Sequence, residues 1–176
     1  MGIRRSVAAV LRGCRIVWIG DYEDLSVEVK YAGIDAPLSS PAEGNFRECE
    51  RKLQRMGIPL FPLNVEFIRK VSLRGMEIAE ELKGKGVEVF EVYPYATRVI
   101  LGIAPGAKKT RKEGLRRILE DLRKFVDVPE LSHDEVDAVI AALTVKLYVS
   151  GDGFAISGRD GTIIVPSPAA RRRADS

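Results

Sequence analysis

The sequence predicts an α/β fold in which a mixed β-sheet is flanked by α-helices. Strand-like segments come first and close together, within the first 36 residues, and strand and helix patterns then alternate to the end of the chain. This order is typical of a mixed sheet with helices packed on it. A length of 176 residues, with 45% hydrophobic and 30% charged residues, predicts one soluble globular domain.

Three or four strands are expected before Pro37. Segments rich in β-branched residues alternate with turn signals, and Arg12-Gly13 separates the first two, which indicates a hairpin. Asp24 to Val29 is either a further strand or a short helical turn. The other strand segments are Ser6 to Leu11, Arg15 to Ile19 and Tyr31 to Ala36.

Two helices are expected next. Helical spacing runs from Arg47 to Met56 and stops at Gly57, and the two prolines that follow exclude regular strand pairing. Asn64 is expected to cap a longer helix that runs to about Lys83. The apolar face of this helix is expected to consist of Phe67, Val71, Ile78 and Leu82.

The second half of the chain is expected to alternate between strands and helices. In order these are a strand at Val87 to Val92, an amphipathic helix at Thr110 to Phe125, a more apolar helix at Ser132 to Val149, and a hairpin at Phe154 to Val165. The last residues, 167–176, contain an arginine triplet and look disordered. We therefore expect a single domain over residues 1–166 and a basic tail over 167–176.

Composition and motifs argue against several classes of protein. Cys14 and Cys49 have neither a paired nor a metal-ligand spacing, so a reducing cytoplasm is the simplest compartment. The run from Val7 to Leu11 is too short for a signal peptide, and that from Ala138 to Leu143 is far short of the roughly 20 residues of a membrane span. Phosphate-loop, dinucleotide-binding, nucleophile-elbow and zinc motifs are not found. The sequence predicts a cytoplasmic protein with no membrane segment.

Asp35 is the first candidate site residue. It lies at the carboxyl end of the third expected strand, in the motif Gly-Ile-Asp-Ala-Pro at residues 33–37, and ligands of open α/β sheets bind at such ends. A carboxylate there needs solvent, hydrogen bonds or a metal, because burying it bare costs many kcal/mol. The alternative interpretation is that Asp35 caps the turn from Pro37 to Ser40.

Two more candidates open the last long helix. Ser132 and Glu135 have the spacing of a capping box, and the helix dipole favours Asp134 in the first turn. Asp137 is not explained in this way, because it begins an apolar run where a charge is a desolvation liability. Residues three apart project from one side of a helix. Facing Asp35, the two acids would complete an oxygen-rich site suited to Mg²⁺ or Mn²⁺.

Three other features have two interpretations each. His133, the one histidine of the chain, is expected to be a supporting hydrogen-bonding group more often than a metal ligand. Glu91, near a strand end, is either the ion-pair partner of Arg98 or a fourth site residue. The segment from Lys108 to Lys124 has eight basic and three acidic residues, so it either neutralises phosphates or is simply a solvated helix face.

Four segments in this order resemble the domain of unknown function 429 family, whose members are predicted nucleases of RNase H-like fold. They are GIDAPLS at 33–39, FRECER at 46–51, EVYP at 91–94 and HDEVDA at 133–138, and with a closing strand at 161–166 the resemblance covers about residues 6–166. The order is also similar to Holliday-junction resolvases of the same fold, in which an acid ends the fourth strand and two acids three apart open the last helix. Asp35, Asp134 and Asp137 match those positions. The resemblance implies that these acids hold two divalent ions, which activate a water and stabilise the leaving oxygen of a phosphodiester.

One departure from the family pattern concerns the first strand of the fold. That strand normally carries an aspartate that bridges both metals, but the chain opens Met1-Gly2-Ile3-Arg4-Arg5-Ser6 and has no acid before Asp21. Either upstream residues are missing from this chain, or the site has lost this ligand. Loss of a central ligand would weaken metal binding and could abolish cleavage.

Three functions follow from the sequence. The first is a metal-dependent nuclease with Mg²⁺ or Mn²⁺ held by Asp35, Asp134 and Asp137, with Glu91 and His133 as supporting groups and DNA or RNA as substrate. The second is a non-catalytic RNase H-like module that binds nucleic acid or a protein partner, which the absent first aspartate favours. The third is an enzyme that acts on nucleotides or other phosphorylated small molecules, since related folds also build kinases.

Overall fold

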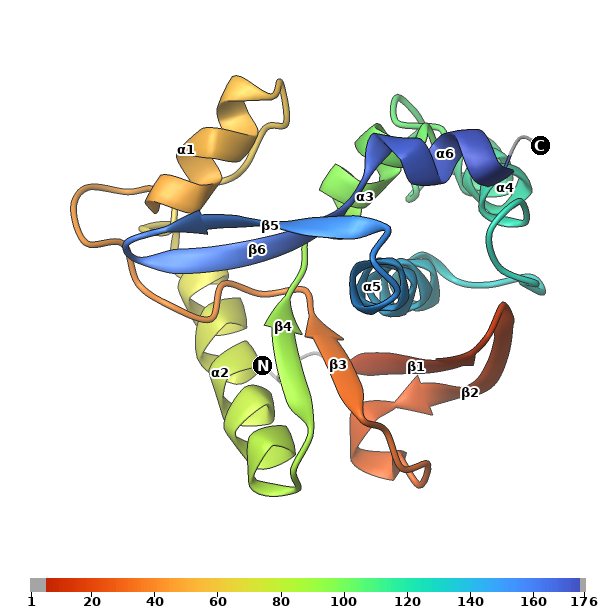
Figure 1. Ribbon diagram of the computed structural model, residues 1–176, viewed down its shortest axis with the longest axis horizontal. Coiled ribbons are helices and arrows are strands. Elements are labelled where there is room, and N and C mark those ends of the chain that lie inside the picture. The colour runs from red at the N-terminus through yellow and green to blue at the C-terminus, as the bar shows by residue number, and fades with distance from the viewer. Residues whose placement is uncertain (1–5, 175–176) are drawn as a thin grey trace.

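The computed structural model of the chain describes residues 6–174. These residues form a mixed α/β fold of six strands, six α-helices and one short 3-10 helix, η1 (Figure 1). The strands are β1 (Val7–Arg12), β2 (Arg15–Asp21), β3 (Tyr31–Ile34), β4 (Glu88–Glu91), β5 (Gly153–Gly158) and β6 (Gly161–Pro166). The helices are η1 (Tyr22–Asp24), α1 (Glu48–Arg55), α2 (Glu66–Gly84), α3 (Pro94–Leu101), α4 (Lys112–Leu122), α5 (His133–Val149) and α6 (Pro168–Ala174).

The strands pair as three two-stranded sheets. β1 and β2 form the expected antiparallel hairpin, β5 and β6 form the second one, and β3 pairs with β4 in parallel, with Ile34 opposite Glu91. A single bridge between Val92 and Ile164 links the end of β4 to β6. The expectation of one mixed sheet was wrong in this respect. Strand propensity identifies which segments are extended, but it does not determine which edges pair.

Helix α5 is the central element of the fold. It packs against β1, β2, β3, β5, β6 and α3, and Figure 1 shows it nearly end-on among the strands. Val136, Val139, Ile140 and Leu143 are fully buried and join the largest apolar cluster, which includes the buried face of α4. The capping box is confirmed at the start of α5, where the Ser132 Oγ accepts a hydrogen bond from the backbone N–H of Glu135.

The start of α2 differs from the expected one. The helix begins at Glu66 with Val65 at the N-cap, because the backbone N–H of Val65 donates to the carbonyl of Pro62 in a preceding turn. Asn64 is therefore not the cap. Ile78 and Leu82 are buried as expected, but Phe67 is 60% exposed. The amino-terminal half of α2 thus leaves large apolar side chains in solvent.

Two helices were missed by the sequence analysis. α3 begins with Pro94 and ends at Gly102, whose φ of 72° is the left-handed conformation that favours glycine after a helix. α6 occupies most of the tail that was expected to be disordered, and this prediction was wrong for Pro168–Ala174 because Ala170 is buried against the largest apolar cluster. The departure at Met1–Arg5 lies outside the described residues. No helix among the described residues is long and apolar enough to cross a membrane.

Candidate functional site

Asp35 follows β3 directly, between two helices that approach the strand closely. A Cβ on Gly33 would lie 2.7 Å from Cγ2 of Val145 in α5, and a Cβ on Gly75 of α2 would lie 2.5 Å from the Cβ of Ala36. Any side chain at either glycine would push a helix away from the strand. The two glycines therefore allow α5 and α2 to hold the strand end that carries Asp35.

The carboxyl group of Asp35 retains solvent-exposed surface, although many protein atoms surround it. Burial raises its pKa to about 6, the ammonium of Lys109 lowers it, and the carboxylate of Glu91 raises it further. Tyr93 lies nearby as well, since burial and then Asp35 raise the pKa of its phenol to about 12. Asp35 is therefore a carboxyl group whose pKa lies above that of an ordinary aspartate.

Asp134 and Asp137 project from the first turns of α5. The Nζ of Lys109 donates to Oδ2 of Asp137, and both side chains are partly buried, with 34% of Lys109 and 21% of Asp137 exposed. Asp134 is more exposed, and its Oδ1 lies 2.9 Å from Nδ1 of His133. His133 is thus a neighbour of Asp134.

Lys109 is the residue on which the three predicted acids converge. Burial lowers its pKa, whereas the charges of Asp35 and Asp134 raise it, and Asp137 forms the ion pair. The acids come from two elements separated by about a hundred residues, yet all three lie within electrostatic reach of one ammonium. We call Asp35, Lys109, Asp134 and Asp137 the acid–lysine site.

The loop between α3 and α4 holds Lys109 in place. The guanidinium of Arg98, buried at the end of α3, donates to the carbonyl oxygens of Ile103, Ala104 and Ala107. A Cβ on Gly114 of α4 would lie only 2.2 Å from the carbonyl oxygen of Lys108. Arg98 therefore holds residues 103–107 of the loop, and Gly114 packs against Lys108. Lys109, which follows Lys108, lies within reach of the acids.

Glu91 belongs to a separate, buried ion cluster. Its carboxylate accepts hydrogen bonds from Nη1 and Nη2 of Arg47, at 2.8 and 2.5 Å, and from the backbone N–H of Leu38 at 2.8 Å. Arg47 also donates to Glu50. Of the two interpretations of Glu91, the pairing with Arg98 is wrong, because the guanidinium of Arg98 donates to loop carbonyls. We call Arg47, Glu50 and Glu91 the arginine cluster.

The arginine cluster fixes the loop that leaves Asp35. Burial acts to lower the pKa of Arg47, but its hydrogen bonds to Glu91 and Glu50 outweigh this and raise it, so the guanidinium stays charged. Glu91 anchors the loop at Leu38, and Arg47 donates to the hydroxyl of Ser39 at 2.9 Å. Asp160 in the β5–β6 turn caps α1 by accepting from the N–H of Glu48. Glu91 therefore positions the neighbourhood of Asp35 from inside the protein.

The fit of a divalent metal depends on how close the acids come to one another. Among the described residues, no group of three or more histidine, cysteine, aspartate or glutamate side chains is arranged so that it could hold a metal ion. The ammonium of Lys109 pairs with Asp137 and lies within electrostatic reach of Asp35 and Asp134. The donors are of the oxygen type that Mg²⁺ and Mn²⁺ prefer, but in this arrangement they do not fit a metal.

Sequence reasoning missed Lys109 and Arg47. Lys109 lies in a run of basic residues in which its pattern does not differ from that of its neighbours. Arg47 lies in the segment at 46–51 that carries the family resemblance, and a conspicuous arginine beside two acids there was the available signal. Only the fold brings Arg47 to Glu91, 44 positions away.

Comparison with known proteins identifies one family. The family model described as protein of unknown function (DUF429) matches residues 3–162. No curated protein and no solved structure matches the chain.

Proposed function

We propose that this chain, which belongs to the DUF429 family of proteins of unknown function, is a nuclease-like enzyme of RNase H-like fold that binds and hydrolyses phosphodiesters of nucleic acid. The observation that carries the proposal is the convergence of Asp35, Asp134 and Asp137 on Lys109. Carboxylates gathered at a strand end and a helix start, with one oriented cation, are the groups that phosphoryl transfer uses.

The RNase H-like part of the proposal rests on where the acids lie. Asp35 follows a strand of the parallel pair β3–β4, and Asp134 and Asp137 open the helix that packs across the strands. Ligands of α/β folds bind at the carboxyl ends of such strands. The small sheets and the helices on them are compatible with this placement.

Three residues of the acid–lysine site, Asp35, Lys109 and Asp137, have a chemical task in this proposal. Asp35, with a pKa of about 6, can accept a proton from an attacking water near neutral pH. Lys109 can neutralise a non-bridging phosphate oxygen, where negative charge accumulates during the reaction. Asp137 holds the ammonium in place through its ion pair.

A divalent cation enters the proposal only as a competitor of Lys109. We propose that Mg²⁺ or Mn²⁺ binds Asp35, Asp134 and Asp137 when the ammonium withdraws, and no step above depends on it. A calorimetric titration with Mn²⁺ tests this: Lys109→Gln should bind more tightly than the wild-type chain, and Asp137→Asn should lose binding. Equal affinities in all three proteins would exclude a metal at these acids.

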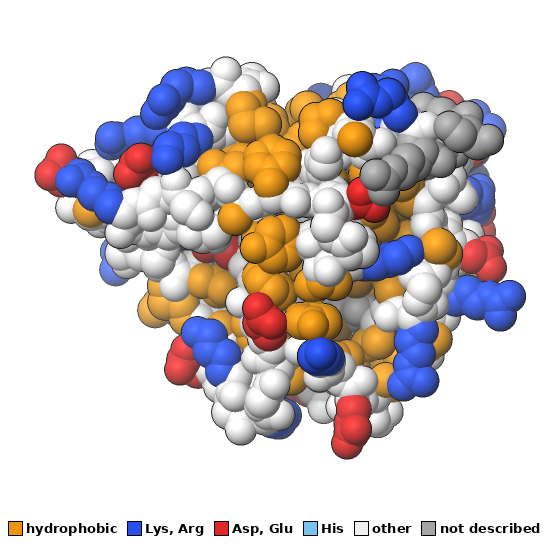
Figure 2. Space-filling model, viewed as in Figure 1, with side chains coloured by type: hydrophobic (Ala, Val, Ile, Leu, Met, Phe, Trp, Pro, Cys, Tyr) orange, Lys and Arg blue, Asp and Glu red, His pale blue; other side chains and the backbone are white. Residues whose placement is uncertain are grey.

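Exposed cations near the site supply a surface for the phosphate backbone. Lys108, Arg111, Lys112 and Arg117 are exposed and form no ion pair with another described residue. Figure 2 shows lysine and arginine side chains along the edge of the molecule where α4 lies. Such side chains bind phosphates without reading sequence.

The test is a cleavage assay on end-labelled single-stranded, duplex and branched DNA and on RNA, with Mg²⁺, with Mn²⁺ and with a chelator. Asp137→Asn and Asp35→Asn should each lower the rate at least about a hundredfold, as expected of residues that act on the proton or charge of the transition state. Asp127→Asn, an exposed acid outside the site, is the matched control and should keep full activity.

A second candidate function is a non-catalytic module that binds nucleic acid. Lys109 already neutralises Asp137, and this observation favours binding without cleavage. Wild-type protein that binds DNA or RNA but leaves every substrate intact, with and without metal, would support the module and contradict the enzyme.

A further inference from the structure

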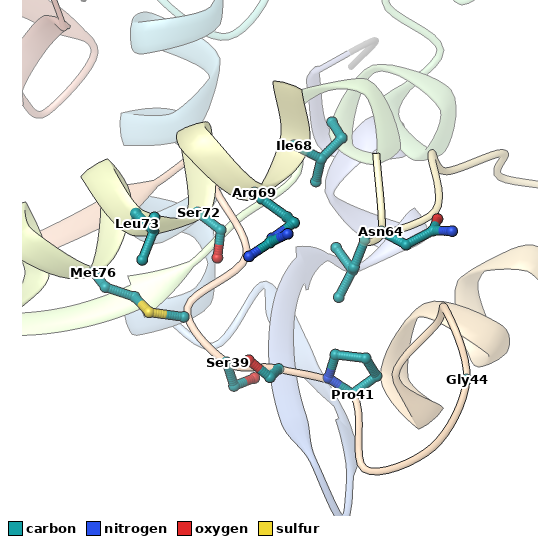
Figure 3. A pocket seen from close by; sticks show the side chains of 11 residues that line it. Ser39, Pro41, Gly44, Asn64, Ile68, Arg69, Ser72, Leu73 and Met76 are labelled. Atoms are coloured by element: carbon teal, nitrogen blue, oxygen red, sulfur yellow. The ribbon is translucent and has the colours of Figure 1, made fainter. Parts of the chain in front are cut away.

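A pocket of about 440 Å³ lies between the loop that follows Asp35 and the amino-terminal half of α2 (Figure 3). Ser39, Ser40 and Pro41 of the loop form one side of it, and Ile68, Arg69 and Met76 of α2 belong to the other. This volume lies in the range of pockets that bind small ligands or single residues of a polymer. We call it the loop–α2 pocket.

Charge selects the kind of ligand. Arg69 is the one charged side chain among the described residues that line the pocket, and it forms no ion pair with any other described residue. Its neighbour in sequence, Lys70, pairs with Glu66 at 2.8 Å. Figure 3 shows the guanidinium of Arg69 directed from α2 toward the loop that carries Ser39. A guanidinium without a counter-ion, facing a hollow, favours an anionic group such as a phosphate.

The remaining lining divides into polar and apolar groups. The side chains of Ser40 and Asn64 form no hydrogen bond with another described residue, whereas Ser72 donates to the carbonyl of Pro37. Ile68, Leu73 and Met76 form an apolar wall, and Leu73 is largely exposed. A nucleotide matches this lining. Its base can stack on the apolar wall while the polar edge of the base meets the side-chain amide of Asn64, and its phosphate carries the negative charge.

Two exposed aromatic rings lie just before α2 and in its first turn. Phe61 and Phe67 are 71% and 60% exposed, although large apolar side chains are usually covered in a folded protein. Bases of single-stranded nucleic acid stack on such rings, and duplexes do not offer their base faces. Phe61 and Phe67 are thus exposed rings within eight residues of Arg69 along the chain, and stacking rings together with an unpaired cation are the two features of a surface that binds single strands.

We propose that the loop–α2 pocket binds one nucleotide of a single-stranded nucleic acid, with its phosphate on Arg69 and its base against Leu73 and Met76. This inference rests on the proposed function, because it names the form of nucleic acid that reaches Asp35. Ser39 and Ser40, which line the pocket, follow Asp35 by four and five residues, and in this proposal the bound strand extends from the pocket toward the acid–lysine site.

Fluorescence anisotropy with a labelled 12-mer of thymidine and with a duplex of the same length tests the proposal on the full chain. Arg69→Gln should weaken binding of the single strand about tenfold or more, the loss expected for one charge-assisted contact. Lys70→Gln is the matched control, since it removes the same charge one residue away and outside the pocket, and it should change affinity less than about twofold. Phe67→Ser should weaken the single strand and leave the duplex unchanged.

Equal losses of affinity for the 12-mer in Arg69→Gln and Lys70→Gln would overturn the proposed binding in the pocket. They would indicate that the strand responds only to the overall charge of the protein. Equal affinity for strand and duplex, or no binding of the 12-mer by the wild-type chain, would overturn it too. The cleavage assay separates this result from the proposed function. If the wild-type chain and Arg69→Gln cleave at equal rates, the proposed nuclease activity is supported and the proposed pocket is not. If Arg69→Gln selectively loses binding of the single strand and no protein cleaves any substrate, the pocket is supported and the nuclease activity is not.

Discussion

The arginine cluster and the acid–lysine site hold similar side chains in different surroundings. Arg47, Glu50 and Glu91 are 0, 2 and 7% exposed, and their charges meet in several hydrogen bonds that also reach the backbone. At the acid–lysine site, Asp35 and Asp134 retain exposed surface and a single ion pair joins Lys109 to Asp137. In the arginine cluster the carboxylate oxygens all accept hydrogen bonds from the protein, so these carboxylates stabilise the fold. In the acid–lysine site some carboxylate oxygens are exposed to solvent and are available to a ligand.

The difference predicts opposite effects of neutralising mutations. Removal of one partner from a buried ion pair leaves an uncompensated charge, which costs about 3–5 kcal/mol. Neutralisation of one of the three partly solvated acids in the acid–lysine site relieves repulsion between carboxylates and changes the free energy of unfolding little.

Arg47→Leu should lower the free energy of unfolding by about 3–5 kcal/mol, because Glu50 and Glu91 would stay buried without their cation. For a chain of this length the midpoint of thermal unfolding should fall by roughly 6–20 °C. Arg55→Leu, an exposed arginine at the end of the same helix, is the control and should shift the midpoint little. A comparable loss in both variants would show that the cluster adds nothing specific.

Gly114→Ala should lower the free energy of unfolding by about 1–3 kcal/mol, because the new methyl group would collide with the carbonyl of Lys108. It should also displace Lys109 and so weaken the pair with Asp137. Urea unfolding measures the first effect. Gly84→Ala at the end of α2 has open space around the added methyl group and should be neutral or slightly stabilising.

Asp35→Asn should stabilise the protein at high pH and not at low pH. The pKa of Asp35 is about 6 in the folded protein, above the value of about 3.9 in unfolded chains, so the folded state holds the proton more tightly. Stability of the wild-type chain is therefore lost as the pH rises from about 4 to about 6, and the loss persists above that range. After allowance for solvent around an exposed carboxyl, the variant should gain about 1 kcal/mol at pH 8.

Thermal unfolding of wild type and Asp35→Asn at pH 4 and pH 8 gives this difference directly. The two midpoints should coincide at pH 4 and separate by about 2–4 °C at pH 8. A constant separation at both values would mean that the substitution acts through packing and not through ionisation.

Lys109→Gln should change stability by less than about 0.5 kcal/mol, yet it should raise the pKa of Asp35 further, because the ammonium is the charge that lowers it. The carboxyl ¹³C shift of Asp35, followed by nuclear magnetic resonance against pH, measures this effect. Lys108→Gln, on the exposed neighbour, should leave the titration of Asp35 unchanged. If the titration curve of Asp35 does not shift in Lys109→Gln, the ammonium of Lys109 does not act on Asp35, and Asp35 does not belong to the acid–lysine site.

Local sequence signals predicted the elements whose residues need no distant partner. The hairpin of β1 and β2 follows from its strand segments and from Gly13, whose φ is 60° in the turn. The start of α5 follows from Ser132 and Glu135, which cap each other three residues apart. Both signals work because the interacting groups are close in the chain.

Elements that depend on distant contacts were predicted less well. Phe67 fits an apolar helical pattern, yet it is exposed because no other part of the described chain covers the first turns of α2. Ala170 lies in a short basic segment without an apolar period, yet α6 forms because this residue is buried. In both cases tertiary packing decided against the local pattern.

The sequence by itself determined which acids are candidates, because Asp35 ends a strand and Asp137 begins an apolar helical run where an unneeded charge is costly. Only the tertiary structure decided their partners. It brings Lys109 to Asp35 and Asp137 across 74 and 28 positions, and it withdraws Glu91 into a pair with Arg47. Electrostatic energy depends on distance in space and on burial, and a pattern along the chain contains neither.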